Sequence, residues 1–284
     1  MKAAILIAWA GALSAGAVQA GQTYGDTLVA QTLSRHPEVL ALSLYATPPK
    51  APASVVIASS KLPAGQATPD SAAAVQGSGQ PAQVADGVAV ATIVPLLDVA
   101  GEPIGALSAT LPAADDAARP ALLKQTEALR EELRRKVINV ANLLDPYPYV
   151  QDAPNSPYAQ RLVDQLMAAH PELLVLALHV RNASGSDYPI IASSIGRIGK
   201  KADHDDMQVV TTGEPLTGAY GPNKSRFGIE LAMYDAAGSR IGAMSVGFHH
   251  HGADEEPALV QRARQIEAEL RAQIPSLAQL LSAQ

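Results

Sequence analysis

The 284-residue chain contains no cysteine, which excludes disulfides, thiolate metal sites and covalent haem attachment through a CxxCH motif. Aromatic residues make up only 4% of the chain, so platforms that stack nucleobases are not expected. The formal net charge is -6, whereas proteins that bind phosphate backbones need a basic face. We therefore expect no nucleic-acid partner.

The sequence also lacks the short motifs that accompany common enzyme chemistry. It has no GxSxG nucleophile elbow, no HExxH zinc motif, no Walker phosphate loop and no GxGxxG after a predicted strand. Two serine pairs recur at predicted strand ends, at Ser59–Ser60 and Ser193–Ser194, where capping of turns or helices explains them. We expect a protein that is not an enzyme and that needs no cofactor.

The first twenty residues read MKAAILIAWAGALSAGAVQA. One lysine, an apolar run and small residues before Gly21 are typical of a secretory signal peptide that is cleaved after Ala20. The alternative is an uncleaved membrane anchor, although the apolar run is short for the ~20 residues of a membrane span. No later apolar run reaches that length. We therefore expect an exported, periplasmic protein with no membrane span after cleavage.

What the chain does contain is a long internal repeat. HPEVLALSLY begins at His36, and HPELLVLALH begins 134 positions later at His170. At this offset, residues 24–81 are identical to residues 158–215 at 18 of 58 positions without a gap. Chance does not maintain an alignment over that length. After an insertion of three residues the offset becomes 137, and DVAGEPIGALS at Asp98 matches DAAGSRIGAMS at Asp235. The sequence therefore predicts a duplicated module of about 125 residues, the size of an independent domain.

The boundaries of the modules follow from local composition. Pro, Asp, Asn and Ser cluster in LLDPYPYVQDAPNSPY, between two helical patterns. We predict a signal peptide at residues 1–20, a first module at 21–147 and a second module at 148–284. Each module begins with an amphipathic helix that ends at His36 or His170, because a residue before proline avoids the helical region. We interpret both histidines as structural helix ends.

Each helix is followed by two strands, a polar crossover, three more strands and a charged closing helix. The last two strands form a hairpin whose turn, DVAGE or DAAGS, combines an Asp that bonds turn amides with a Gly that adopts positive φ. The predicted class is α+β, with an antiparallel sheet of about five strands and N- and C-terminal helices in each module. The helices would cover one face of the sheet, and a ligand would lie between the other face and the crossover.

The string IASSIGRIGKKADHDDMQVVTTGEP and the hairpin YDAAGSRIGAMSV of the second module resemble the Cache branch of extracellular PAS-like sensor domains. The first module keeps the strand, a GSGQP turn and the hairpin, but has AGQATPDSA in place of IGKKADHDD. The resemblance implies two tandem PAS/Cache-like modules that bind organic acids, amino acids or other metabolites. Since we see neither a C-terminal membrane helix nor a signalling domain, we expect either a binding protein or signalling through a partner such as a membrane sensor or transporter.

The second module carries the side chains that a carboxylate-binding pocket needs, a cation or guanidinium and hydroxyl donors. The first crossover has no charge except Asp70, and Tyr45 replaces His179. We therefore expect the second module to bind a small polar metabolite, an organic acid or an amino acid, although a solvated loop is the alternative. The predicted ligand-binding residues are His179, Arg181, Lys200, Asp203, Tyr220 and Arg226.

Three consecutive histidines, His249, His250 and His251, follow the last predicted strand. Imidazoles with nearby carboxylates suit Zn, Ni or Cu. Adjacent residues of a strand point to opposite faces, however, and the first module has LPAAD here. A polar loop is the favoured interpretation and a metal site the alternative. Two other functions thus stay open: a structural or partner-binding periplasmic protein with vestigial pockets, and a histidine-dependent divalent-metal binder.

Overall fold

The computed structural model describes residues 22–153, 156–182 and 187–282. The predicted signal peptide, residues 1–20, lies outside the described residues. The chain divides into two compact units at Tyr147 and Pro148, which are called the first and second module below. Each module is described by itself.

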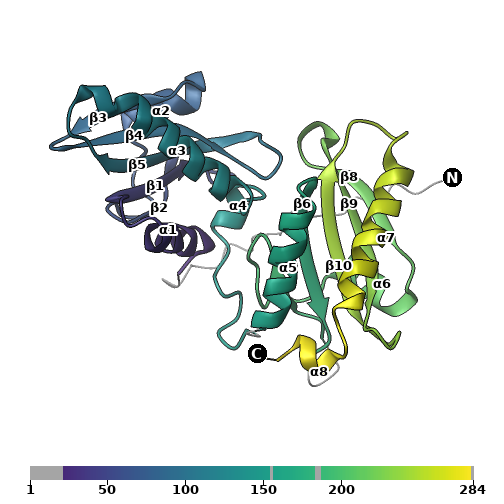
Figure 1. Ribbon diagram of the computed structural model, residues 1–284. Coiled ribbons are helices and arrows are strands. Elements are labelled where there is room, and N and C mark those ends of the chain that lie inside the picture. The colour runs from purple at the N-terminus through teal and green to yellow at the C-terminus, as the bar shows by residue number, and fades with distance from the viewer. Residues whose placement is uncertain (1–21, 154–155, 183–186, 283–284) are drawn as a thin grey trace. The chain divides into compact units, whose positions relative to one another are not determined.

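Each module contains one antiparallel sheet of five strands, and the strand order is the same in both (Figure 1): β2-β1-β5-β4-β3 in the first and β7-β6-β10-β9-β8 in the second. The elements of the first module are α1 (Tyr24–Arg35), β1 (Ala41–Ala46), β2 (Val55–Ser59), α2 (Asp70–Ser78), β3 (Ala82–Asp86), β4 (Ala89–Leu97), β5 (Pro103–Pro112), η1 (Asp116–Ala118), α3 (Arg119–Arg134) and α4 (Val140–Leu143). Those of the second module are α5 (Pro157–Ala169), β6 (Leu173–Val180), β7 (Ile190–Ser193), α6 (His204–Thr212), β8 (Leu216–Tyr220), η2 (Pro222–Lys224), β9 (Arg226–Tyr234), β10 (Arg240–His249), α7 (Glu256–Ala272) and α8 (Leu277–Leu280). The predicted class, α+β with five-stranded antiparallel sheets, is confirmed.

Helices α5 and α7 cover one face of the second sheet (Figure 1). The main core of the module lies between these helices and the sheet. Alternate residues of β9, such as Phe227 and Ile229, point to this side and pack with Leu166 of α5 and Ile266 of α7. The first module repeats this arrangement with α1 and α3, where Leu28 and Leu129 join Leu107 of β5 in one buried cluster. The helices predicted at the two ends of each module thus bury the same face of their sheet.

The crossover of each module contains a helix that the sequence analysis did not predict, α2 in the first module and α6 in the second. Asp203 begins α6 because its side chain accepts hydrogen bonds from the backbone N–H groups of Asp205 and Asp206. The Asp206 carboxylate in turn accepts from the Asp203 N–H, which completes a capping box. The helix ends at Gly213, whose φ of 80° is in the left-handed region. This short helix packs on the second face of the sheet, opposite α5 and α7.

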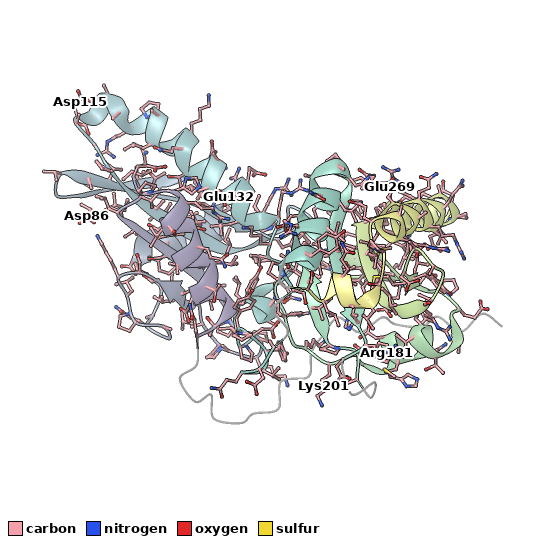
Figure 2. The ribbon with its side chains drawn as sticks, turned by 60° about the horizontal axis from the view of Figure 1, so that its bottom comes forward. Asp86, Asp115, Glu132, Arg181, Lys201 and Glu269 are labelled. Carbon is pink, nitrogen blue, oxygen red and sulfur yellow. The ribbon has the colours of Figure 1, made fainter. Side chains whose placement is uncertain are left out.

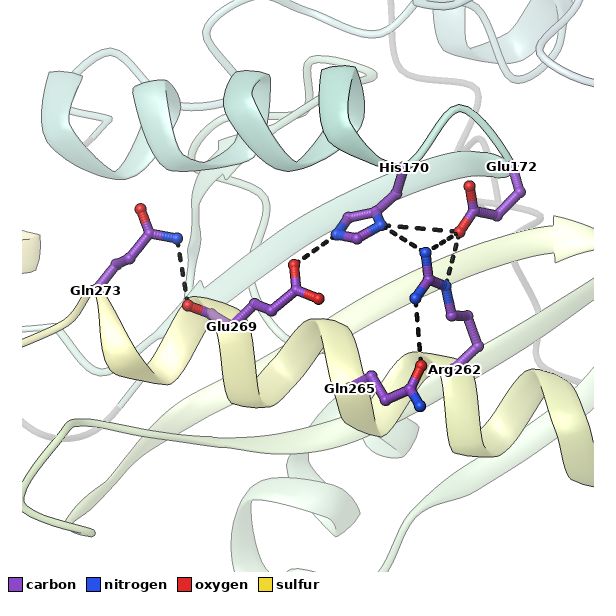
Figure 3. Close-up of polar contacts among 6 residues, drawn as sticks. All are labelled: His170, Glu172, Arg262, Gln265, Glu269 and Gln273. Carbon is purple, nitrogen blue, oxygen red and sulfur yellow. Dashed lines mark hydrogen bonds and ion pairs between the residues drawn. The ribbon is translucent and has the colours of Figure 1, made fainter.

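His170 joins the end of α5 to the closing helix α7 (Figure 3). Its Nε2 lies 2.7 Å from Oε2 of Glu269, and Arg262 donates to its Nδ1 at 2.8 Å. Because Nδ1 accepts, the proton of the neutral ring is on Nε2 and is donated to Glu269. Oε1 of Glu172 accepts a hydrogen bond from Nε of the same guanidinium at 2.7 Å. The first module keeps the same contact: Nε2 of His36 lies 2.8 Å from Glu132 of α3.

His170→Ala is expected to lower the free energy of unfolding of the second module by about 1–3 kcal/mol, because two hydrogen bonds to charged partners are lost at a side chain that is only 7% exposed. The measurement is urea unfolding followed by amide hydrogen exchange, which reports each module separately. Gln265→Ala is the matched control, since Gln265 contacts the same Arg262 from the exposed side of α7. Equal stability of His170→Ala and the control would contradict the structural role of this histidine.

Candidate functional site

A cavity of about 390 Å³, which includes space open to solvent, lies between the second face of the sheet and the crossover of the second module. The lining combines apolar, polar and ionisable side chains from β6, β7, β9, β10, α6 and the loop between β7 and α6. The lining residues are Ala177, His179, Ile190, Ile195, Arg197, Lys200, Asp203, Asp206, Glu230 and Ser245.

The floor of the cavity is a row of paired residues that crosses three strands. Ser245 of β10 is paired with Glu230 of β9 on one side and with Ala177 of β6 on the other. Paired residues of neighbouring strands present their side chains on the same face, so the hydroxyl and the carboxyl lie next to one another. Ser245 is 1% exposed and Glu230 is 4% exposed. Two polar side chains are therefore buried at the bottom of this cavity.

His179 and Asp206 form a buried pair at the wall of the cavity. Nε2 of His179 lies 3.4 Å from Oδ1 of Asp206, and both side chains are almost fully buried. Nδ1 of His179 lies 3.1 Å from the carbonyl oxygen of Tyr188, so it carries a proton and donates to that oxygen. Burial raises the pKa of the Asp206 carboxyl, and the neighbouring His179 opposes this rise. The pair fixes α6 against the end of β6.

Glu230 is the most strongly perturbed acid that the structure describes. Burial, together with the carboxylates of Asp206, Asp203 and Asp205, raises the pKa of Glu230 to about 9, whereas Lys200 opposes the shift. The carboxyl is therefore neutral near pH 7. Within the described residues, Oε2 of Glu230 and Oγ of Ser245 are both buried without a hydrogen-bond partner. Buried polar atoms normally have partners, so this pair offers binding capacity to a ligand.

The structure brings three of the six predicted binding residues to the cavity, namely His179, Lys200 and Asp203. Arg181, Tyr220 and Arg226 are not among its lining residues. Arg181 follows β6, where its side chain is exposed (Figure 2). Tyr220 and Arg226 are paired at the β8–β9 end of the sheet. Arg226 shares the face of Glu230 but lies four residues along the strand, about 13 Å away at 3.3 Å per residue.

Four polar lining residues were missed by the sequence analysis: Arg197, Asp206, Glu230 and Ser245. One signal for Glu230 was available, because the internal alignment places this acid opposite Ile93, between the apolar residues Ile229 and Leu231. Arg197 stands out only in the structure, where it adopts φ of 65° in the segment GRIG, a left-handed conformation that costs a non-glycine residue free energy and occurs at binding sites.

The corresponding space of the first module is filled by apolar side chains. Tyr45, Ala72 and Ile93 stand at the positions of His179, Asp206 and Glu230. They belong to one buried cluster with Val56, Val75 and Ala106. Substitution of three polar positions by apolar ones therefore turns the same fold from a polar cavity into a packed core.

The histidine run at the end of β10 does not converge on one point. Nδ1 of His250 lies 2.9 Å from the carbonyl oxygen of Lys224, and its Nε2 lies 3.2 Å from Glu256. His251 contacts Glu255, and its ring centroid lies 6.2 Å from that of His249. Across the described part of the chain, no group of three or more His, Cys, Asp or Glu side chains could hold a metal ion. The metal alternative stays a prediction without support from this geometry.

None of the helices described here combines the length and the apolar character that a membrane crossing needs.

No family model matches the chain, and neither does a curated protein. The GAF domain of nlh2 from A. Aeolicus is 11% identical, with 41% of this chain and 93% of that chain covered at a TM-score of 0.32. The C-terminal domain of the E. coli transcriptional regulator KdgR is 12% identical, with 42% and 98% covered at a TM-score of 0.29. PelD from Pseudomonas aeruginosa PAO1 is 16% identical, with 89% and 78% covered at a TM-score of 0.28. These TM-scores are too low to support an inference about function.

Proposed function

We propose that this chain is an exported, periplasmic binding protein of the Cache type that takes up a small polar metabolite in its second module and performs no chemistry on it. The observation that supports the proposal best is the contrast between the two modules. The second module has a polar cavity whose buried floor groups have no partner among the described residues, and the first has an apolar cluster at the same positions.

The residues of the cavity suit recognition of a small molecule. Lys200 supplies a cationic group at the wall, Glu230 and Ser245 supply the floor, and Ile190 and Ile195 supply apolar surface. A few placed polar groups in an otherwise apolar concavity are typical of metabolite sites. Under this proposal the first module is a structural unit. A membrane sensor or transporter remains the proposed partner through which binding is read.

A thermal-shift screen of organic acids and amino acids, followed by titration calorimetry of the compounds that stabilise, tests this function. We expect at least one compound to raise the melting temperature of the wild-type chain. Lys200→Ala should weaken its binding at least tenfold, because an ion pair or charge-assisted hydrogen bond in a partly buried site is lost. His179→Tyr with Glu230→Ile, which copies the first module, should abolish binding by filling the cavity.

The matched control is Lys61→Ala, since Lys61 is an exposed lysine of the first module whose only ion pair among those described joins Asp86 at 3.7 Å. It should leave binding unchanged. If no compound binds, or if the filled double variant binds as wild type does, the cavity is vestigial and a structural or partner-binding role takes the place of the proposed function.

A further inference from the structure

The floor of the cavity raises a question about the charge of the ligand, and the answer rests on the function proposed above. Oε2 of Glu230 and Oγ of Ser245 lack partners among the described residues, although both residues are more than nine-tenths buried. Both side chains line the cavity. A ligand that reaches the floor therefore meets a carboxyl and a hydroxyl that have no competing hydrogen bond at these atoms.

The groups that face Glu230 can be named element by element. The start of α6 supplies Asp203, Asp205 and Asp206. The loop before α6 supplies Lys200 and Arg197, and β6 supplies His179. The paired residues on either side of Glu230, Leu216 of β8 and Ser245 of β10, carry no charge.

The balance of these charges favours a cation at the floor. With Glu230 ionised, four carboxylates face two permanent cations, and one of the carboxylates, that of Asp206, is already paired with His179. An anionic ligand would add a further negative charge to this group, whereas an ammonium group offsets the excess. An ammonium also has three donors. Two of them can donate to Oε2 of Glu230 and Oγ of Ser245, which have no partner among the described residues.

We infer that the ligand carries a cationic nitrogen that is held by Glu230 and Ser245, and that Glu230 gives up its proton when this nitrogen binds. The step is a simple exchange. The neutral carboxyl releases one proton to the buffer, the resulting carboxylate pairs with the ammonium group, and no covalent bond to the ligand forms or breaks. Lys200, at the wall, is then placed to receive an acceptor group at the other end of the same ligand.

Because binding releases a proton, the affinity for the ligand should increase as the pH rises. Because the pKa of Glu230 in the empty cavity is about 9, the proton must leave for binding to occur at any lower pH. The dissociation constant should therefore fall about tenfold for each pH unit between pH 6 and pH 8. A ligand that used the neutral carboxyl as a donor would show no such gain.

The test compares probes that differ in the nitrogen alone: glycine with acetate, β-alanine with propanoate, and 4-aminobutanoate with butanoate. Titration calorimetry of the full chain is run at pH 6, 7 and 8, and at pH 7 in phosphate and in Tris. We expect the nitrogen-bearing member of at least one pair to bind tenfold tighter or more than its partner. We also expect the two buffers to reveal release of about one proton per ligand.

Glu230→Gln keeps the shape of the neutral side chain and removes the proton that is exchanged. It should weaken binding of the nitrogen-bearing probe at least tenfold and remove the pH dependence. Glu267→Gln is the matched control, because Glu267 is also an acid whose pKa burial raises, and its Oε1 is also buried without a described partner. It lies on α7, which covers the opposite face of the sheet, so both affinity and pH dependence should be unchanged.

Two different failures can be told apart. If only the nitrogen-free acids bind, or if the affinity for the nitrogen-bearing probe does not rise with pH, the binding function stands and this inference is overturned. If neither these probes nor the broader panel of metabolites bind, the proposed function fails and the inference fails with it.

Discussion

Gly242→Ala is expected to destabilise the second module by about 3 kcal/mol or more. A Cβ at this position would lie 1.9 Å from the carbonyl oxygen of His179 and 3.0 Å from its carbonyl carbon. The obstacle is backbone of the adjacent strand β6, which cannot rotate away as a side chain would. The clash can be relieved only if β6 and β10 move apart where they pair.

The same contact recurs in the first module, where a Cβ on Gly105 would lie 2.0 Å from the carbonyl oxygen of Tyr45. Both glycines lie beside an irregularity in the pairing with the preceding strand, between Arg240 and Gly242 in the second module. Gly105→Ala should therefore destabilise the first module by a similar amount. Because the backbone of His179 forms the wall beside Asp206, Gly242→Ala should also impair the cavity, whereas Gly105→Ala should spare it.

Urea unfolding with amide hydrogen exchange measures both variants, since exchange assigns the loss of stability to one module. Gly77→Ala is the control, because a Cβ there has no neighbour within 4 Å and the residue lies inside α2. It should be neutral or stabilise by up to about 1 kcal/mol. Gly242→Ala with wild-type stability would show that the two strands do not approach one another in this way.

The second large effect is expected from Glu230→Gln on stability in the absence of any ligand. In the unfolded chain this carboxyl ionises near its ordinary pKa of 4.5, whereas in the folded chain its pKa is about 9. Between these values only the folded state holds the proton, so the free energy of unfolding falls as the pH rises. Each pH unit in this range costs about 1.4 kcal/mol at most.

Glu230→Gln removes this cost, because the amide is neutral in both states. The variant should exceed the wild type in stability by on the order of 3 kcal/mol at pH 8, and the two should be nearly equal at pH 5. Urea unfolding at the two pH values gives the difference directly. A wild-type second module that does not lose stability between pH 5 and pH 8 relative to Glu230→Gln would mean that Glu230 is solvated rather than buried.

The succession of strands along the chain was predictable from the sequence because short-range contacts determine where strands end and turns begin. Asp98 illustrates this: its side chain accepts from the N–H groups of Ala100 and Glu102, and Gly101 adopts φ of 84°. These contacts are set within five residues of chain. The terminal helices were also predictable, because their apolar spacing and their proline boundaries are local patterns.

The site was predicted only in part, because a cavity depends on pairing between distant strands. Arg226 was predicted for its guanidinium and lies on the same face of β9 as Glu230, but only the pairing of Glu230 with Ser245 shows that the cavity is four residues further along the strand. Glu230 was not predicted, because only its pairing with Ser245 shows that it lies at the floor of the cavity. The helix α6 was missed because the crossover was interpreted as a polar loop that carries the ligand-binding residue Asp203, whereas the side chains of Asp203 and Asp206 cap a helix.

The packed cluster around Tyr45, Ala72 and Ile93 gives this molecule an internal reference. A probe placed at matching positions of the two modules experiences the same temperature, salt and solvent, but only one of the pair is next to a cavity. Subtracting one signal from the other would remove the effects that both modules share and leave the effect of ligand binding to the second module. This chain is therefore a natural starting point for a differential biosensor in which the blank channel and the measuring channel are encoded by one gene.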